Sequence, residues 1–330
     1  MCYNISINPF FVFMLEPTYR SALSHAWQLV WHHKIMWIFG IFSVVLSHFG
    51  VSNFVGQIMA LDRRSFFYRD YSAFFSFDYW QPLISGWSLW LFLIVLLLVI
   101  LVVLISVAAE GAIIAAASEW FHKHTTPRFD QAWHRGIKHF WRLLAVRVMQ
   151  RIILGALLLL IGYLLSRFAQ VESSINTFYK VVVFAAGFLV AFMVSAISIY
   201  AAGYIVHDEN SLRTALEKAT YLFRRHVVVS MELSVIELVL SLCLGVLFIS
   251  SSFWLLVPSV ILSVIAGLTG YLSLITFGIV FSLVLFVITV ILLGGIFYAF
   301  IISTWIYLFM KMHHEGVASR ILSWLGMKRV

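Results

Sequence analysis

The chain has 330 residues, of which 62% are hydrophobic and only 11% are charged, and its mean hydropathy is +0.99. Soluble domains carry roughly a quarter charged residues, so this composition excludes an ordinary water-soluble domain and is typical of a membrane protein. Its two cysteines, Cys2 and Cys243, cannot form a disulfide framework. The net charge of +8 comes from basic residues dispersed beside apolar segments. This distribution indicates membrane topology and argues against nucleic acid as a partner.

A helix needs roughly 20 apolar residues to cross a hydrocarbon core about 30 Å thick. On that criterion the sequence predicts an all-α transmembrane bundle of about six spans, forming a single domain over residues 1–330. The spans are expected near residues 35–54, 87–117, 143–165, 181–206, 227–253 and 272–310. We expect a re-entrant or interfacial piece at residues 258–268. If residues 255–271 formed a span instead, there would be seven spans and the C-terminus would lie outside.

The distribution of Lys and Arg between alternate loops indicates the orientation. Most loop cations lie before the first span, between the second and third, between the fourth and fifth, and after the sixth; the opposite loops hold only Arg63, Arg64, Arg69, Arg167 and Lys180. Cationic loops are retained on the cytoplasmic side, so an even number of spans is expected, with both termini in the cytoplasm. The outer loop at residues 56–85 is rich in aromatic residues and is expected to settle at the lipid headgroups.

Three segments resemble one another: YRSALSHAWQLVWH (residues 19–32), FDQAWHRGIKHFWR (129–142) and LRTALEKATYLFRR (212–225). Aligned without gaps, they match at Ala22, Ala132 and Ala215, at Ala26, Gly136 and Ala219, and at His32, Arg142 and Arg225. Apolar residues recur at helical spacing, so each segment is predicted to form an amphipathic helix on the cytoplasmic surface before an odd-numbered span. Asp130 and either Asn210 or Ser211 are candidate N-caps.

This internal repeat divides the chain into units of an interfacial helix and a two-span hairpin, at about residues 17–124, 125–207 and 208–310, with an amphipathic tail at 311–330. His32, Arg142 and Arg225 are candidates for contact with anionic lipid headgroups. The alternative is that the surface helices only anchor the bundle. The even-numbered spans are rich in small residues, which predicts close helix packing at a central axis.

Five ionisable residues fall inside the predicted spans: Glu110, Arg147, Arg151, Glu232 and Glu237. Charges in the membrane are costly, so a paired network that links the second, third and fifth spans is expected. Such a cluster either clamps the helices in order or lines a polar cavity that binds an anionic headgroup or relays protons. The sequence leaves both interpretations open.

The sequence gives only weak indications of a metal-binding or catalytic site. Glu119, His122, His124, His134 and His139 are metal-ligating residue types, but their spacing matches no zinc motif. No phosphate-binding loop, dinucleotide fingerprint or nucleophile elbow is present, so no catalytic residue, metal or cofactor is predicted.

The segments WHHKIMWIFGIFS (31–43), FDQAWHRGIKHFWRLLAV (129–146) and SLRTALEKATYLFRRH (211–226) resemble a group of uncharacterised bacterial six-span membrane proteins. That group is similar to the membrane domain attached to some glycerophosphoryl diester phosphodiesterases. The resemblance implies a multi-pass protein of the bacterial inner membrane. It does not imply phosphodiesterase activity, because the chain lacks the catalytic barrel.

The sequence therefore favours a non-enzymatic integral membrane protein that interacts with lipids, with a membrane-protein partner or with a second copy. A small-solute transporter that uses the intramembrane charges is the alternative. An intramembrane enzyme is the third and least favoured class.

Overall fold

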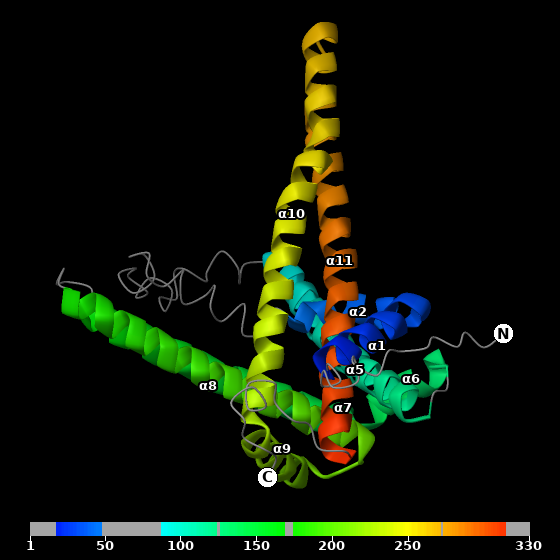
Figure 1. The fold of residues 1–330 in the computed structure, drawn as a ribbon. Coiled ribbons are helices and arrows are strands. Elements are labelled where there is room, and N and C mark those ends of the chain that lie inside the picture. The colour runs from blue at the N-terminus through cyan, green and yellow to red at the C-terminus, as the bar shows by residue number, and fades with distance from the viewer. Residues whose placement is uncertain (1–17, 48–86, 124–125, 169–173, 272, 315–330) are drawn as a thin grey trace, which may run out of the picture.

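The computed structural model describes residues 18–47, 87–123, 126–168, 174–271 and 273–314, and within these ranges all regular structure is helical. The helices are α1 (Thr18–His32), α2 (Ile35–Ser47), α5 (Trp87–Lys123), α6 (Phe129–Lys138), α7 (Phe140–Phe168), α8 (Ser174–His207), α9 (Leu212–Arg225), α10 (Val227–Thr269) and α11 (Ser273–His314) (Figure 1). The predicted all-α polytopic bundle is thus confirmed.

Five helices, α5, α7, α8, α10 and α11, are long and apolar enough to cross a membrane. Helix α2 is apolar but shorter, and the rest of the predicted first span, residues 48–54, lies outside the described residues. The aromatic loop at 56–85 and residues 315–330 of the predicted tail also lie outside them.

The predicted re-entrant piece at residues 258–268 is wrong. Helix α10 runs without interruption through Pro258 and ends only at Thr269. A break in lipid would leave several backbone groups without partners, whereas a proline inside a helix removes a single hydrogen bond. The turn to α11 occurs instead at Gly270, whose φ of +77° suits glycine and whose N–H donates to the Ala266 carbonyl at 2.8 Å.

The three predicted amphipathic segments form α1, α6 and α9, which we call the collar. Helix α6 is shorter than expected, because the helix breaks at His139 and α7 begins at Phe140. Arg142 therefore belongs to the first turn of the following long helix. Of the two candidate caps, Asn210 and Ser211, it is Ser211 that caps α9 by accepting from the Thr214 N–H. Asp130 is not a cap, since it lies inside the first turn of α6.

Each collar helix packs on a different long helix: α1 on α11, α6 on α5, and α9 on α8. The aligned alanines Ala22, Ala132 and Ala215 are all buried at these contacts. Gly136 shows why small residues are needed one turn later, since a Cβ there would lie 2.3 Å from the Ala108 carbonyl oxygen. The matched small residues thus let the collar helices lie directly against the long helices.

The small residues of α5, α8 and α11 predicted close packing, and these three long helices do contact one another in pairs. Their small residues are buried there, including Ala109, Ala112, Ala116, Ala201, Ala202 and Ala299. Gly295 faces α2 instead, where its backbone lies against Gly40 and Ile41.

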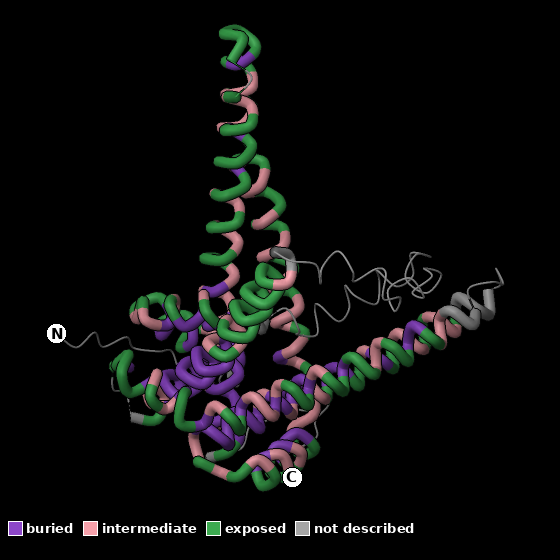
Figure 2. The backbone as a smooth tube through the Cα atoms, turned by 180° about the vertical axis from the view of Figure 1, so that it is seen from behind, coloured by how far each residue is buried: buried purple, intermediate pink, exposed green. Residues whose placement is uncertain are grey.

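Buried residues gather where the long helices meet the collar (Figure 2). The α10–α11 hairpin extends away from this core, and α8 leaves it in another direction, so the far parts of these helices are exposed (Figures 1 and 2). The core therefore lies at the collar end, where the candidate site residues are found.

Candidate functional site

Glu110 and Arg147 form a buried ion pair between α5 and α7. Glu110 is only 2% exposed. The Arg147 guanidinium binds both carboxylate oxygens, with Nε donating to Oε2 at 2.9 Å, and its Nη1 also donates to Gln150 Oε1 at 2.6 Å. This fork-shaped contact neutralises the carboxylate and satisfies most of the guanidinium donors. The predicted link between the second and third spans is therefore present.

The two glutamates of α10 make different contacts. Glu232 accepts a hydrogen bond from the Tyr19 hydroxyl of α1, and Glu237 accepts one at 2.9 Å from the Trp305 Nε1 of α11. Arg151 is half-buried one turn after Arg147. Glu110 and Arg147 are thus paired directly, and the two glutamates of α10 accept hydrogen bonds from neutral donors of α1 and α11.

Sequence reasoning did not single out Gln150, Trp305 or Tyr298 as site residues. Tyr298 of α11 lies close enough to Arg147, Arg151 and Glu237 to interact electrostatically with all three. The spacing of Gln150 three residues after Arg147 is a signal that could have been read. Trp305 and Tyr298 are found only from the packing of α11.

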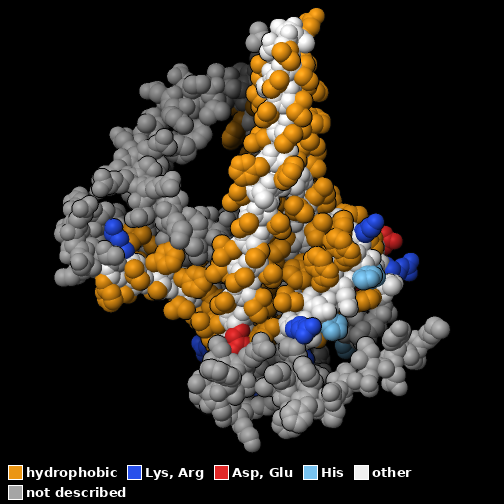
Figure 3. All heavy atoms as spheres, turned by 45° about the horizontal axis from the view of Figure 1, so that its top comes forward, with side chains coloured by type: hydrophobic (Ala, Val, Ile, Leu, Met, Phe, Trp, Pro, Cys, Tyr) orange, Lys and Arg blue, Asp and Glu red, His pale blue; other side chains and the backbone are white. Residues whose placement is uncertain are grey.

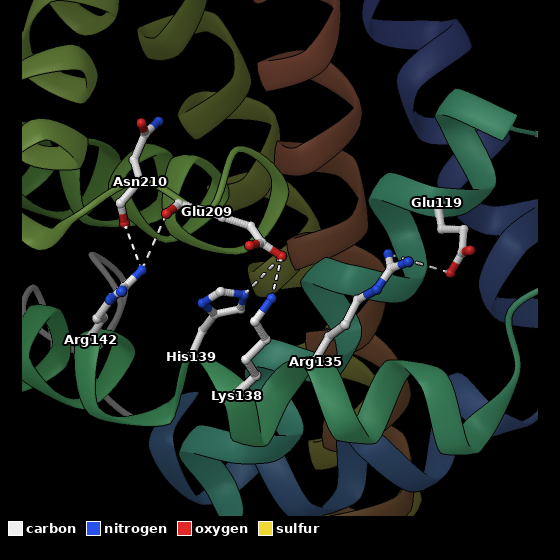
Figure 4. A network of polar contacts seen from close by, with 7 residues as sticks. All are labelled: Glu119, Arg135, Lys138, His139, Arg142, Glu209 and Asn210. Carbon is white, nitrogen blue, oxygen red and sulfur yellow. Dashed lines mark hydrogen bonds and ion pairs between the residues drawn. The ribbon is translucent and has the colours of Figure 1, made fainter.

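A second polar network lies at the collar end, where the α8–α9 loop meets the junction of α6 and α7 (Figure 4). Lys138 Nζ donates to Glu209 Oε1 at 2.6 Å, and His139 Nε2 lies 3.9 Å from the same oxygen. Arg142 Nη1 donates to the backbone carbonyls of Glu209 and Asn210, both at 3.2 Å. These contacts fasten the second collar helix to the loop that precedes the third.

His139 is held neutral in this network. Burial lowers its pKa, and the cations Lys138, Arg142 and Arg135 lower it further, against the opposing effect of Glu209. Its side chain is 3% exposed, and its Nε2 has no hydrogen-bond partner among the described residues. The pKa of Glu209 is lowered, first by the hydrogen bond from Lys138. The loop therefore carries a stable carboxylate beside a buried, uncharged imidazole.

The three residues predicted to contact lipid headgroups differ in how far their side chains are available for such a contact. His32 and Arg225 are exposed at the last turns of α1 and α9. His32 Nδ1 lies 3.0 Å from the Gln28 carbonyl oxygen, and the other ring nitrogen, Nε2, takes no part in that contact. Arg142 is exposed, but its guanidinium already binds two backbone carbonyls, so it is less available to a lipid headgroup than an exposed cation without such contacts.

Exposed aromatic rings accompany the cations of the collar. Trp27 and Trp31 stack on one another with ring centroids 5.2 Å apart, and each is about half exposed. Trp141 and Tyr221 are exposed still further. Lys, Arg and His side chains gather at this end of the molecule, whereas the surface of the α10–α11 hairpin is covered by hydrophobic side chains (Figure 3). The collar therefore combines the two residue types that anchor proteins at the membrane–water boundary.

The candidate metal ligands are dispersed. Glu119 lies 3.7 Å from Arg135 Nη1, and the His122 ring lies edge-on to that of His207. His124 lies outside the described residues. Within the described ranges, no three His, Cys, Asp or Glu side chains are placed to hold a metal ion.

The fold and these sites define a polytopic helical membrane protein with an amphipathic collar at one end. No protein family, curated protein or solved structure matches the chain.

Proposed function

We propose that this chain is a non-enzymatic, multi-pass protein of the bacterial inner membrane that binds anionic lipid headgroups through its collar. The observation that carries the proposal is the pairing of exposed tryptophans with exposed cations on helices that lie across the ends of apolar helices. Indole rings favour the headgroup level, and Arg and Lys favour lipid phosphates.

The proposed orientation places the collar and both termini in the cytoplasm. The basic residues of α6, α9 and the segments beside them lie at the collar end, and positive loops are retained on that side. The similar packing of α1, α6 and α9 on separate long helices supports three repeated units. In this arrangement each unit contributes one helix to a continuous lipid-facing surface.

Arg225→Gln tests the proposal most directly, because Arg225 is an exposed cation at the end of α9. We expect the affinity for phosphatidylglycerol to fall about fivefold, since one basic residue near an anionic surface contributes about 1 kcal/mol. The measurement is native mass spectrometry of the full chain released from vesicles of phosphatidylglycerol and phosphatidylcholine.

Arg213→Gln is the matched control in the same helix. Arg213 Nε already contacts Glu217 Oε1 at 3.0 Å, so this change should alter lipid binding much less. Equal retention of phosphatidylglycerol by wild type and Arg225→Gln, or equal retention of both lipids, would show that the collar is only an anchor.

The transporter alternative gains no support from the helices. Discontinuous helices near the midplane mark many transporters. The region around Pro258 and Gly270 that suggested one is a continuous helix followed by a turn.

A further inference from the structure

A crevice of about 50 Å³ lies between α8 and α10, and all its lining residues belong to these two helices. Its α10 wall carries three polar side chains, Ser234, Glu237 and Ser241, at positions i, i+3 and i+7 and hence on one helix face. Its α8 wall carries two aromatic rings, Phe188 and Phe192, one turn apart. The remaining lining is apolar. The crevice therefore sets one carboxylate and two hydroxyls opposite two aromatic rings.

The polar groups of this crevice have unused hydrogen-bonding capacity. Ser230 and Ser263, in the same helix, donate to backbone carbonyls one turn earlier. Ser234 and Ser241 form no hydrogen bond with any other residue that the structure describes. Only one oxygen of Glu237, Oε2, accepts from Trp305, so its Oε1 remains for another donor.

Glu237 also lacks a counter-charge. Glu110 is neutralised by Arg147, but no cationic side chain of the described residues forms an ion pair with Glu237. A carboxylate inside a span is costly, and a neutral indole donor does not compensate its charge. The Trp305 hydrogen bond instead fixes the carboxylate in one orientation. The site is thus an oriented carboxyl group with no cation of its own.

We infer that the α8–α10 crevice binds the primary ammonium group of an amphiphile, with Glu237 as its counter-ion. A primary ammonium has three N–H donors, of which one can reach Glu237 Oε1 and another the hydroxyl of either Ser234 or Ser241, which flank Glu237 along the helix. The faces of Phe188 and Phe192 add the electrostatic attraction of aromatic rings for cations. A trimethylammonium group has no N–H donor to offer these oxygen acceptors, so the crevice should favour a –CH₂–NH₃⁺ terminus.

Two amphiphiles carry this group: an aminophospholipid such as phosphatidylethanolamine, and a free long-chain amine. In both, the hydrocarbon remains in the membrane beside α8 and α10 while the ammonium enters the crevice. This site differs from the collar in position and in charge preference, so either can exist without the other.

The test titrates the full chain in mild detergent with dodecylamine, dodecyltrimethylammonium or phosphatidylethanolamine and counts bound molecules by native mass spectrometry. We expect saturable binding of a primary amine and at least tenfold weaker binding of the trimethylammonium compound. Glu237→Gln keeps the shape and an acceptor for Trp305 but removes the charge, so it should weaken amine binding at least tenfold. Ser234→Ala/Ser241→Ala, which removes both flanking hydroxyls, should weaken it about fivefold, as expected for one lost hydrogen bond.

Glu232→Gln is the control, because it removes a carboxylate from the same helix outside the crevice and should leave amine binding unchanged. Phosphatidylethanolamine that is retained by wild type and lost by Glu237→Gln identifies the lipid as the source; saturable binding of dodecylamine alone identifies a free amine. If the trimethylammonium compound binds equally, if both Glu237→Gln and Ser234→Ala/Ser241→Ala bind like wild type, or if no saturable amine binding is found, the inference is wrong.

Discussion

Among the individual residues, Glu110 and Arg147 show how a buried charge is made tolerable. Neither side chain has free access to water, and each is the other's principal partner. Removal of one member leaves an uncompensated charge in the apolar interior, whereas removal of both leaves none. The pair therefore specifies how α5 and α7 dock, whatever its net contribution to stability.

Arg147→Met should destabilise the protein by about 3–5 kcal/mol, since Glu110 is then buried without a partner. The double variant Glu110→Gln/Arg147→Met should recover most of that loss. Thermal unfolding in detergent, followed by circular dichroism, measures both. A double variant no more stable than the single one would show that the arginine acts through other contacts.

His139 gives the collar a pH dependence with a definite sign. Its folded-state pKa lies below the ordinary value of 6.5, so the unfolded chain takes up a proton first as the pH falls. The free energy of unfolding should therefore be highest above pH 6.5 and should decrease as the pH falls from 6.5 toward the folded-state pKa. Glu209, whose pKa is lowered from 4.5, loses its stabilising contribution only at more acidic pH.

His139→Gln should flatten this decrease between pH 6.5 and 5, because a neutral amide does not titrate. Melting temperatures of the two proteins at pH 7.5, 6.0 and 5.0 test the prediction. His134→Gln alters an exposed histidine of the same helix and is the control. Burial also lowers the pKa of His33 and His226, so a reduced slope remains in the variant.

At the scale of single helices, the spacing of apolar residues predicted most of what is found. In each collar segment the apolar stripe includes one of the aligned alanines, Ala22, Ala132 or Ala215. This stripe correctly predicted the helix and the face of it that is buried. The early end of α6 at Lys138 was not predicted, because the apolar pattern continues through Phe140 while the chain turns at His139 into α7. Likewise, Pro258 suggested a break, but the surrounding apolar environment favours a continuous helix.

Close contact between helices makes a prediction at Gly295. A Cβ at this position would lie 2.6 Å from the Ile41 backbone nitrogen, so Gly295→Ala should separate α2 from α11 and cost about 1–3 kcal/mol. Gly245→Ala in α10 is the matched control, since nothing lies within 4 Å of its new methyl group. That variant should be neutral or more stable by about 0.5–1 kcal/mol. Thermal unfolding of both variants in detergent measures the difference, and equal stability would contradict the contact.

At the scale of the whole molecule, composition predicted an all-α membrane bundle, and small residues predicted a common axis for α5, α8 and α11. The partners of the intramembrane charges could not be predicted in the same way. Residue type indicates that Glu232 and Glu237 need donors, but Tyr19 and Trp305 are 213 and 68 residues away in sequence. Only the three-dimensional arrangement of α1, α10 and α11 brings them together.

The length of the α10–α11 hairpin has a mechanical consequence for the surrounding lipid. Helices of 43 and 42 residues are each about 65 Å long at 1.5 Å per residue, roughly twice the thickness of a hydrocarbon core of about 30 Å. Even at the steep tilt of about 40° seen in membrane helices, such a hairpin exceeds that thickness. If both helices cross the bilayer, we expect the bilayer beside them to be elastically strained, because the hydrophobic length exceeds its thickness. We then expect copies of the protein to share this strained lipid by clustering and to favour thicker membranes.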